Sequence, residues 1–122
     1  MENFGYPVCK EEYANQLKKM MEDKPALVIS TTYCGYCNKA KNLLNRYSIE
    51  YQELVLDTMN PNDSMEIANC VYGRSQRYVP FIFLKGQPVG GYGELVHKHE
   101  SGELKKEFSK VEWELESWEI NK

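Results

Sequence analysis

The sequence has no long apolar run, no excess of basic residues, no repeats and no low-complexity segment. A membrane-spanning helix needs about 20 consecutive apolar residues, and none of the 122 residues belongs to such a stretch. Lysine and arginine number 15 against 18 acidic residues, a net charge of −3, so no basic surface for nucleic acid is expected. We therefore expect a single domain over residues 1–122, with neither membrane nor nucleic acid as a partner.

The first residues, Met-Glu-Asn-Phe-Gly-Tyr-Pro, lack the basic start and apolar middle of a secretion signal. We therefore expect a reducing compartment, the cytoplasm, where permanent disulfides are rare and a close cysteine pair is more often catalytic or metal-binding. Cys34 and Cys37 form such a pair. Cys9 and Cys70 are isolated, and they are interpreted as a free thiol near the terminus and a small apolar residue on a helix.

What the sequence does contain is a regular alternation of helical and extended patterns. Apolar residues make up 42% of the chain and charged residues 27%, which is typical of a soluble globular protein. The order predicts an α/β fold, with a mixed sheet flanked by helices and its first two strands parallel. The predicted elements are a helix over 10–22, a strand over 26–30, a helix after the cysteine pair, a strand over 51–56, a helix over 61–71 and a hairpin over 79–89.

The remainder of the chain after Gly90-Gly91 is predicted to be helical. Five apolar residues recur there every three or four positions, which places them on one face of an extended C-terminal helix. They are Leu104, Phe108, Val111, Leu115 and Trp118.

The segment Cys34-Gly35-Tyr36-Cys37 is the strongest chemical signal in the sequence. A structural zinc site normally takes four ligands from two close pairs; there is no second pair here, and His97 and His99 face different directions on a helix. A purely structural bridge would close too short a loop to add much stability. A redox-active pair remains the favoured interpretation.

The pair falls where a buried strand ends and a helix begins. The free N–H groups of a first helical turn and the helix dipole favour an anion, so the pKa of Cys34 is expected to lie below the usual value of about 8.5. Cys37, one turn further on, is expected to be more buried. Cys34 is thus the predicted nucleophile and Cys37 the resolving thiol.

Four motifs in the same order resemble those of the glutaredoxin family, over roughly residues 9–110. Cys34-Gly35-Tyr36-Cys37 is similar to the family's Cys-Pro-Tyr-Cys, and Arg77-Tyr78-Val79-Pro80 is similar to its Arg-Thr-Val-Pro. The other two matches are Gly90-Gly91-Tyr92-Gly93-Glu94-Leu95 and His99-Glu100-Ser101-Gly102-Glu103-Leu104.

The resemblance implies a thioredoxin-like fold with a central four-stranded mixed sheet, a cis Pro80, and a glutathione-dependent enzyme. The enzyme would reduce protein disulfides and glutathione mixed disulfides in cell redox homeostasis. Its partners would be glutathione and the disulfide-bonded or glutathionylated proteins, and it would be a monomer. The backbone of Val79 would pair with the cysteinyl unit of glutathione, Arg77 would bind the glycyl carboxylate, and the Gly-Gly turn and the next helix start would hold the γ-glutamyl end. The implied glutathione-binding residues are Tyr36, Arg77, Tyr78, Val79, Pro80, Gly91, Tyr92, Gly93 and Glu94.

Three positions depart from the family pattern: Thr31 stands for a lysine, Tyr78 for a threonine, and Gly93 for an aspartate that Glu94 would have to replace. Arg74 and Arg77 are the candidates to supply the missing cation. These departures keep open a protein served by thioredoxin reductase instead of glutathione. Gly35 in place of proline keeps open a [2Fe–2S] carrier or sensor, with a cluster bound between two subunits by Cys34 and glutathione sulfur.

Overall fold

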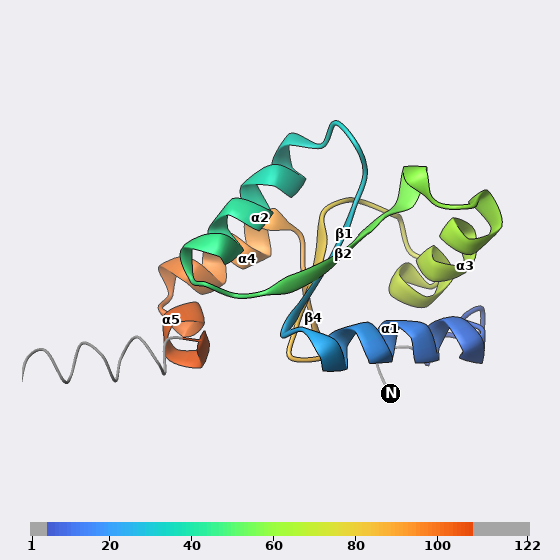
Figure 1. Cartoon of the computed structure of the whole chain (residues 1–122), viewed down its shortest axis with the longest axis horizontal. Coiled ribbons are helices and arrows are strands. Elements are labelled where there is room, and N and C mark those ends of the chain that lie inside the picture. The colour runs from blue at the N-terminus through green and yellow to red at the C-terminus, as the bar shows by residue number, and fades with distance from the viewer. Residues whose placement is uncertain (1–4, 109–122) are drawn as a thin grey trace, which may run out of the picture.

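The computed structural model describes residues 5–108, which form a four-stranded sheet with helices on both faces (Figure 1). A single 3₁₀ turn, η2 (Leu56–Thr58), follows the second strand. The helices and strands are α1 (Glu11–Asp23), β1 (Ala26–Ser30), α2 (Gly35–Arg46), β2 (Tyr51–Val55), α3 (Pro61–Tyr72), β3 (Phe81–Leu84), β4 (Gln87–Gly90), α4 (Tyr92–Glu100) and α5 (Glu103–Phe108). The predicted order of elements is confirmed as far as Gly90.

The strand order is β2-β1-β3-β4, with β1 parallel to β2 and antiparallel to β3. This is the predicted mixed sheet, with its first two strands parallel. Every residue of β1 is buried, as its continuous apolar run indicates. Val28 lies between Glu53 of β2 and Ile82 of β3, so β1 is one of the two inner strands, and it ends four residues before Cys34.

Alternate residues of β1 belong to two separate hydrophobic cores, because successive side chains of a strand point to opposite faces of the sheet. Leu27 and Ile29 pack with α1 and α3, whereas Ala26 and Val28 pack with α2 and α4. Figure 1 shows the same division, with α1 and α3 on one side of the sheet and α2 and α4 on the other. The sheet therefore fixes the position of the first turn of α2, which begins just beyond the end of β1.

Helix α3 begins and ends where its local sequence predicts. The Asn60 side chain accepts hydrogen bonds from the backbone N–H groups of Asn62 and Asp63, and Pro61 opens the helix. Gly73 ends it with a φ of 62°, a conformation that favours glycine.

The prediction of one extended C-terminal helix is wrong for the described residues. Gly102 has a φ of 86°, which ends α4 and starts the separate α5. Leu104 is fully buried and Phe108 packs against the same core. Val111, Leu115 and Trp118 of the predicted stripe lie outside the described residues.

The interpretation of Cys9 and Cys70 as unconnected residues is also wrong, because the two form a disulfide. They are 61 residues apart in the sequence, yet their Cα atoms are 4.4 Å apart. The reason is tertiary: α1 packs against α3, which brings Cys9, two residues before α1, next to Cys70 in the last turn of α3.

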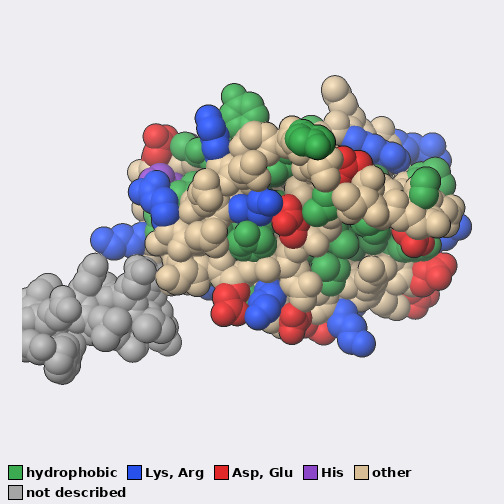
Figure 2. All heavy atoms as spheres, turned by 45° about the horizontal axis from the view of Figure 1, so that its top comes forward, with side chains coloured by type: hydrophobic (Ala, Val, Ile, Leu, Met, Phe, Trp, Pro, Cys, Tyr) green, Lys and Arg blue, Asp and Glu red, His purple; other side chains and the backbone are tan. Residues whose placement is uncertain are grey.

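Among residues 5–108 no helix is long and apolar enough to cross a membrane. Acidic and basic side chains are interspersed on the face shown in Figure 2, in keeping with the small net charge.

Candidate functional site

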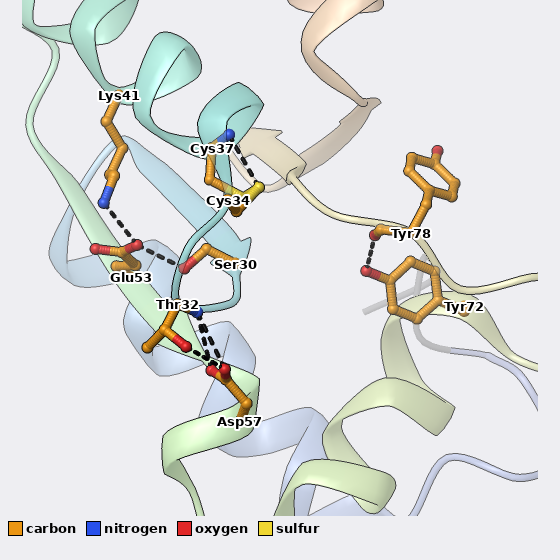
Figure 3. Close-up of a disulfide and its surroundings, with 9 residues drawn as sticks. All are labelled: Ser30, Thr32, Cys34, Cys37, Lys41, Glu53, Asp57, Tyr72 and Tyr78. Carbon is orange, nitrogen blue, oxygen red and sulfur yellow. Dashed lines mark hydrogen bonds and ion pairs between the residues drawn. A yellow bond between two sulfur atoms is a disulfide. The ribbon is translucent and has the colours of Figure 1, made fainter.

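Cys34 is the last residue of the short loop that joins the end of β1 to the start of α2 (Figure 3). It is the N-cap of α2, and its Sγ accepts a hydrogen bond from the backbone N–H of Cys37 at 3.1 Å. Cys34 and Cys37 are joined as a disulfide, with their Cα atoms 5.2 Å apart. The sequence prediction that this sulfur lies against the free amide end of a helix is confirmed.

The two sulfurs differ in their access to solvent. Cys34 is partly exposed, whereas Cys37 is only 1% exposed and belongs to the buried face of α2. An attacking thiol from another molecule can therefore approach Cys34 but not Cys37. This asymmetry matches the predicted division into nucleophile and resolving thiol.

The segment before Cys34 is fastened by Asp57, which follows β2. The Asp57 carboxylate accepts hydrogen bonds from both the backbone N–H, at 3.0 Å, and the hydroxyl of Thr32. These bonds to Thr32 lower the pKa of Asp57 below its usual value, so the carboxylate is charged at neutral pH. The loop that carries the nucleophile is thus held at a point two residues before Cys34.

A second polar group lies behind the cysteine pair (Figure 3). Glu53 of β2 accepts a hydrogen bond from the buried Ser30 hydroxyl at 2.5 Å and pairs with Lys41 of α2 at 3.0 Å. Lys41 and Glu53 are both about one quarter exposed. These contacts tie the end of β1, β2 and α2 together around the pair.

A pocket of about 370 Å³ lies beside the first turn of α2. Its volume is in the range of small-molecule sites. Eight of the nine residues that the sequence assigned to glutathione line it, and only Arg77 does not. They come from three separate segments: Tyr36, Tyr78, Val79, Pro80, Gly91, Tyr92, Gly93 and Glu94.

The wall formed by Tyr78 is fixed by a residue that the sequence analysis missed. The Tyr72 hydroxyl donates to the backbone carbonyl of Tyr78, and the two rings lie 5.8 Å apart. Burial raises the pKa of Tyr72, which keeps its hydroxyl protonated as a donor. No local pattern indicates this role, because Tyr72 reads as an ordinary apolar residue near the end of α3.

The Val79–Pro80 peptide bond is cis, as predicted. Within residues 5–108 no hydrogen bond engages the backbone N–H or carbonyl of Val79. Both groups are therefore available to a ligand in the pocket.

The opposite wall is the start of α4. Glu94 accepts a hydrogen bond from the backbone N–H of Gly91 at 2.7 Å, which leaves its second oxygen for another partner. A Cβ on Gly91 would lie 3.2 Å from the Glu94 carboxylate and 3.4 Å from the Tyr78 ring. Glycine therefore keeps this corner of the pocket open. The Tyr36 and Tyr92 rings, 5.7 Å apart, close the side next to the cysteine pair.

Arg77 lies directly before the pocket residue Tyr78, in the loop between α3 and β3. It is exposed, and its Nη2 donates to the Asn69 side chain at 2.9 Å. Arg74 of the same loop makes no hydrogen bond or ion pair within the described part of the chain. Of the two candidates for the missing cation, only Arg77 is held in place.

Solved structures of similar shape define the class of protein. A crystal structure of the buckwheat glutaredoxin–glutathione complex aligns with a TM-score of 0.71 at 29% identity, covering 83% of this chain and 94% of that one. The holo form of glutaredoxin C1 from Populus tremula x tremuloides aligns with a TM-score of 0.65 at 32% identity, covering 77% and 92%. The fold is thus thioredoxin-like, and the class is that of the thiol–disulfide oxidoreductases.

Sequence comparison specifies the family within that class. The glutaredoxin family model matches residues 26–89. Glutaredoxin-C1 of Arabidopsis thaliana is 32% identical over 103 residues, which is 82% of each chain, and a glutaredoxin of Ricinus communis is 32% identical over 87 residues, 71% of this chain and 84% of the relative. The chain belongs to the glutaredoxin family, with Cys34 and Cys37 as its dithiol motif.

Proposed function

We propose that this glutaredoxin uses glutathione to reduce protein disulfides and glutathione mixed disulfides, with Cys34 as the nucleophile. The observation that carries the proposal is the Cys37 amide directed at the accessible Cys34 sulfur, beside a pocket with free Val79 backbone groups. The buckwheat relative was solved as a glutathione complex, which supports glutathione as the ligand of the corresponding pocket here.

The pocket suggests how each part of glutathione is held. The cysteinyl unit pairs with the Val79 backbone and places its sulfur next to Cys34. The γ-glutamyl end lies at the start of α4, where the first-turn amides bind its carboxylate and Glu94 accepts from its amine. Arg77 binds the glycyl carboxylate.

On a glutathione mixed disulfide, the Cys34 thiolate attacks the glutathione sulfur and the substrate leaves as a thiolate, which takes a proton. A second glutathione thiolate then attacks the glutathione sulfur bound to Cys34. Oxidised glutathione is released and the Cys34 thiolate is restored. Only Cys34 is needed on this route.

On a protein disulfide, Cys34 forms a mixed disulfide with one substrate sulfur and releases the other. Cys37, one helical turn away, then attacks the Cys34 sulfur and frees the second substrate thiol. The product is the Cys34–Cys37 disulfide seen in the structure, and two glutathione molecules return it to the dithiol and leave as oxidised glutathione.

Substitution of either cysteine tests this division of roles. We expect Cys37→Ser to retain glutathione-dependent reduction of a small mixed disulfide but to lose reduction of protein disulfides. Cys34→Ser should abolish both activities, because no accessible nucleophile remains. The measurement couples turnover to NADPH through glutathione reductase, and a parallel assay with thioredoxin reductase tests the alternative electron donor.

Loss of both activities in Cys37→Ser would contradict the assignment of Cys37 as a resolving thiol only. Turnover with thioredoxin reductase but not with glutathione would contradict glutathione as the electron donor.

A [2Fe–2S] carrier or sensor is the alternative proposal. Gly35 supports it, since no atom lies within 4 Å of a Cβ built there and the space next to Cys34 is open. Cys37 is buried, so Cys34 would be the protein ligand, with glutathione sulfur as the second and another copy of the chain supplying the rest. Anaerobic purification with iron and sulfide analysis tests it, and iron-free protein would contradict it.

A further inference from the structure

Arg77 is one end of a line of hydrogen-bonded side chains that runs back along α3. Its Nη2 donates to Asn69 Oδ1 at 2.9 Å, and Asn69 Nδ2 donates to Glu66 Oε1 at 3.1 Å. Glu66 pairs in turn with Lys10, the residue before α1. The four residues are called the anchoring line below.

The hydrogen bonds of the anchoring line run in one direction because Glu66, next to Asn69 in the line, is a buried carboxylate. Glu66 is only 4% exposed, and its hydrogen bond to Lys10 holds its pKa below the usual range. A carboxylate accepts hydrogen bonds and cannot donate them, so Asn69 must turn its amide N–H₂ toward Glu66. The Asn69 carbonyl oxygen is then presented to Arg77, which can only donate.

The inner end of the anchoring line is fixed to the fold. Glu66 and Asn69 are three residues apart on α3 and so lie on one face of the helix. Lys10 follows Cys9, whose disulfide to Cys70 fastens this segment to the same helix. Arg77 itself is exposed, and without Asn69 its long side chain would sample many rotamers.

We propose that Asn69 is a positioning residue for glutathione binding, which holds Arg77 ready for the glycyl carboxylate. This inference rests on the proposed function. The hydrogen bond to Asn69 uses one of the five guanidinium N–H groups, so the others remain for two parallel bonds to a carboxylate. Preorganised Arg77 loses less side-chain entropy when glutathione binds.

The test measures KM for glutathione and kcat separately, with a small mixed disulfide as substrate. We expect Asn69→Ala to raise KM about 3- to 10-fold with kcat unchanged, the size of effect expected when one long side chain must be ordered on binding. Arg77→Ala should raise KM at least as much. The double variant should equal Arg77→Ala alone, since Asn69 acts only through Arg77.

Two matched variants serve as controls. Asn62→Ala removes an exposed asparagine from the same helix, and Arg74→Ala removes the unheld arginine of the same loop. Neither should change KM.

Glu66→Gln is a further test. It keeps a side-chain oxygen but no longer fixes the orientation of the Asn69 amide, so it should raise KM less than Asn69→Ala. It also provides the test if Asn69→Ala fails to fold.

An unchanged KM in Asn69→Ala, beside a raised KM in Arg77→Ala, would overturn the positioning role and leave Arg77 as the anchor. Additive effects in the double variant would also overturn it. An unchanged KM in both single variants would show that Arg77 is not the anchor, whereas Cys34-dependent turnover with glutathione tests the proposed function independently.

Discussion

At the scale of single residues, the chemistry of this protein depends on where one sulfur lies relative to one amide. Cys34 Sγ is 3.1 Å from the Cys37 backbone nitrogen, in a helical turn whose N–H groups have no intrahelical partners. Such an arrangement stabilises a thiolate more than a thiol. Cys34 is partly exposed while it makes this contact, so it can be reached by a substrate.

We predict that the pKa of the Cys34 thiol lies below the usual value of about 8.5. The measurement is the thiolate ultraviolet absorbance as a function of pH, in a chain where Cys9, Cys37 and Cys70 are replaced by alanine so that only one thiol titrates. The same chain in denaturant is the control and should titrate near the usual value. A folded pKa at or above that of the denatured chain would refute the role given to the helix start.

At the scale of elements, two glycines with equally open surroundings have opposite roles, since one begins a helix and the other interrupts one. No atom lies within 4 Å of a Cβ built on Gly35 or Gly102, so neither position is closed to alanine by steric contact. Gly35 is the first residue of α2, whereas Gly102 has a φ of 86° and separates α4 from α5. Backbone conformation alone therefore distinguishes them.

We predict that Gly102→Ala lowers the free energy of unfolding by about 1 kcal/mol, because a side chain there is forced into the left-handed region. Gly35→Ala should instead raise it by about 0.4–1 kcal/mol, since alanine restricts the unfolded chain and suits a helix. Urea denaturation of both variants measures the difference. Equal changes of the same sign in the free energy of unfolding would show that a factor other than backbone φ determines the effect.

At the scale of the whole molecule, the Cys9–Cys70 disulfide is the one covalent link between distant parts of the described chain. It joins the segment before α1 to α3, on the face of the sheet opposite α2. A bond between residues 61 positions apart strongly restricts the unfolded chain, whereas the bond between Cys34 and Cys37 restricts it little.

We predict that replacing Cys9 and Cys70 by alanine lowers the free energy of unfolding by about 2–4 kcal/mol relative to the oxidised protein. Urea denaturation with and without a reductant measures it. Reduction should destabilise the unaltered chain by a similar amount but should change the double variant little, because only the short active-site loop is then opened. A large effect of reduction on the double variant would contradict this account.

The sequence by itself determined the elements whose signals are local. The apolar run at residues 26–30 predicts the fully buried strand β1, and Asn60-Pro61 predicts the start of α3 within a residue. The cysteine spacing at a helix start predicts which sulfur is exposed. Each of these features depends on neighbouring residues, so it is present in the sequence before the chain folds.

Only the tertiary structure decided the contacts between distant segments. The Cys9–Cys70 bond, the Tyr72 hydroxyl on the Tyr78 carbonyl and the line from Lys10 to Arg77 all depend on how α1, α3 and the following loop pack. Cysteine and asparagine have no periodic pattern that pairs them across such distances. The helix break at Gly102 was missed for a related reason, since a lone glycine within an apolar period fits either a continuous helix or a turn.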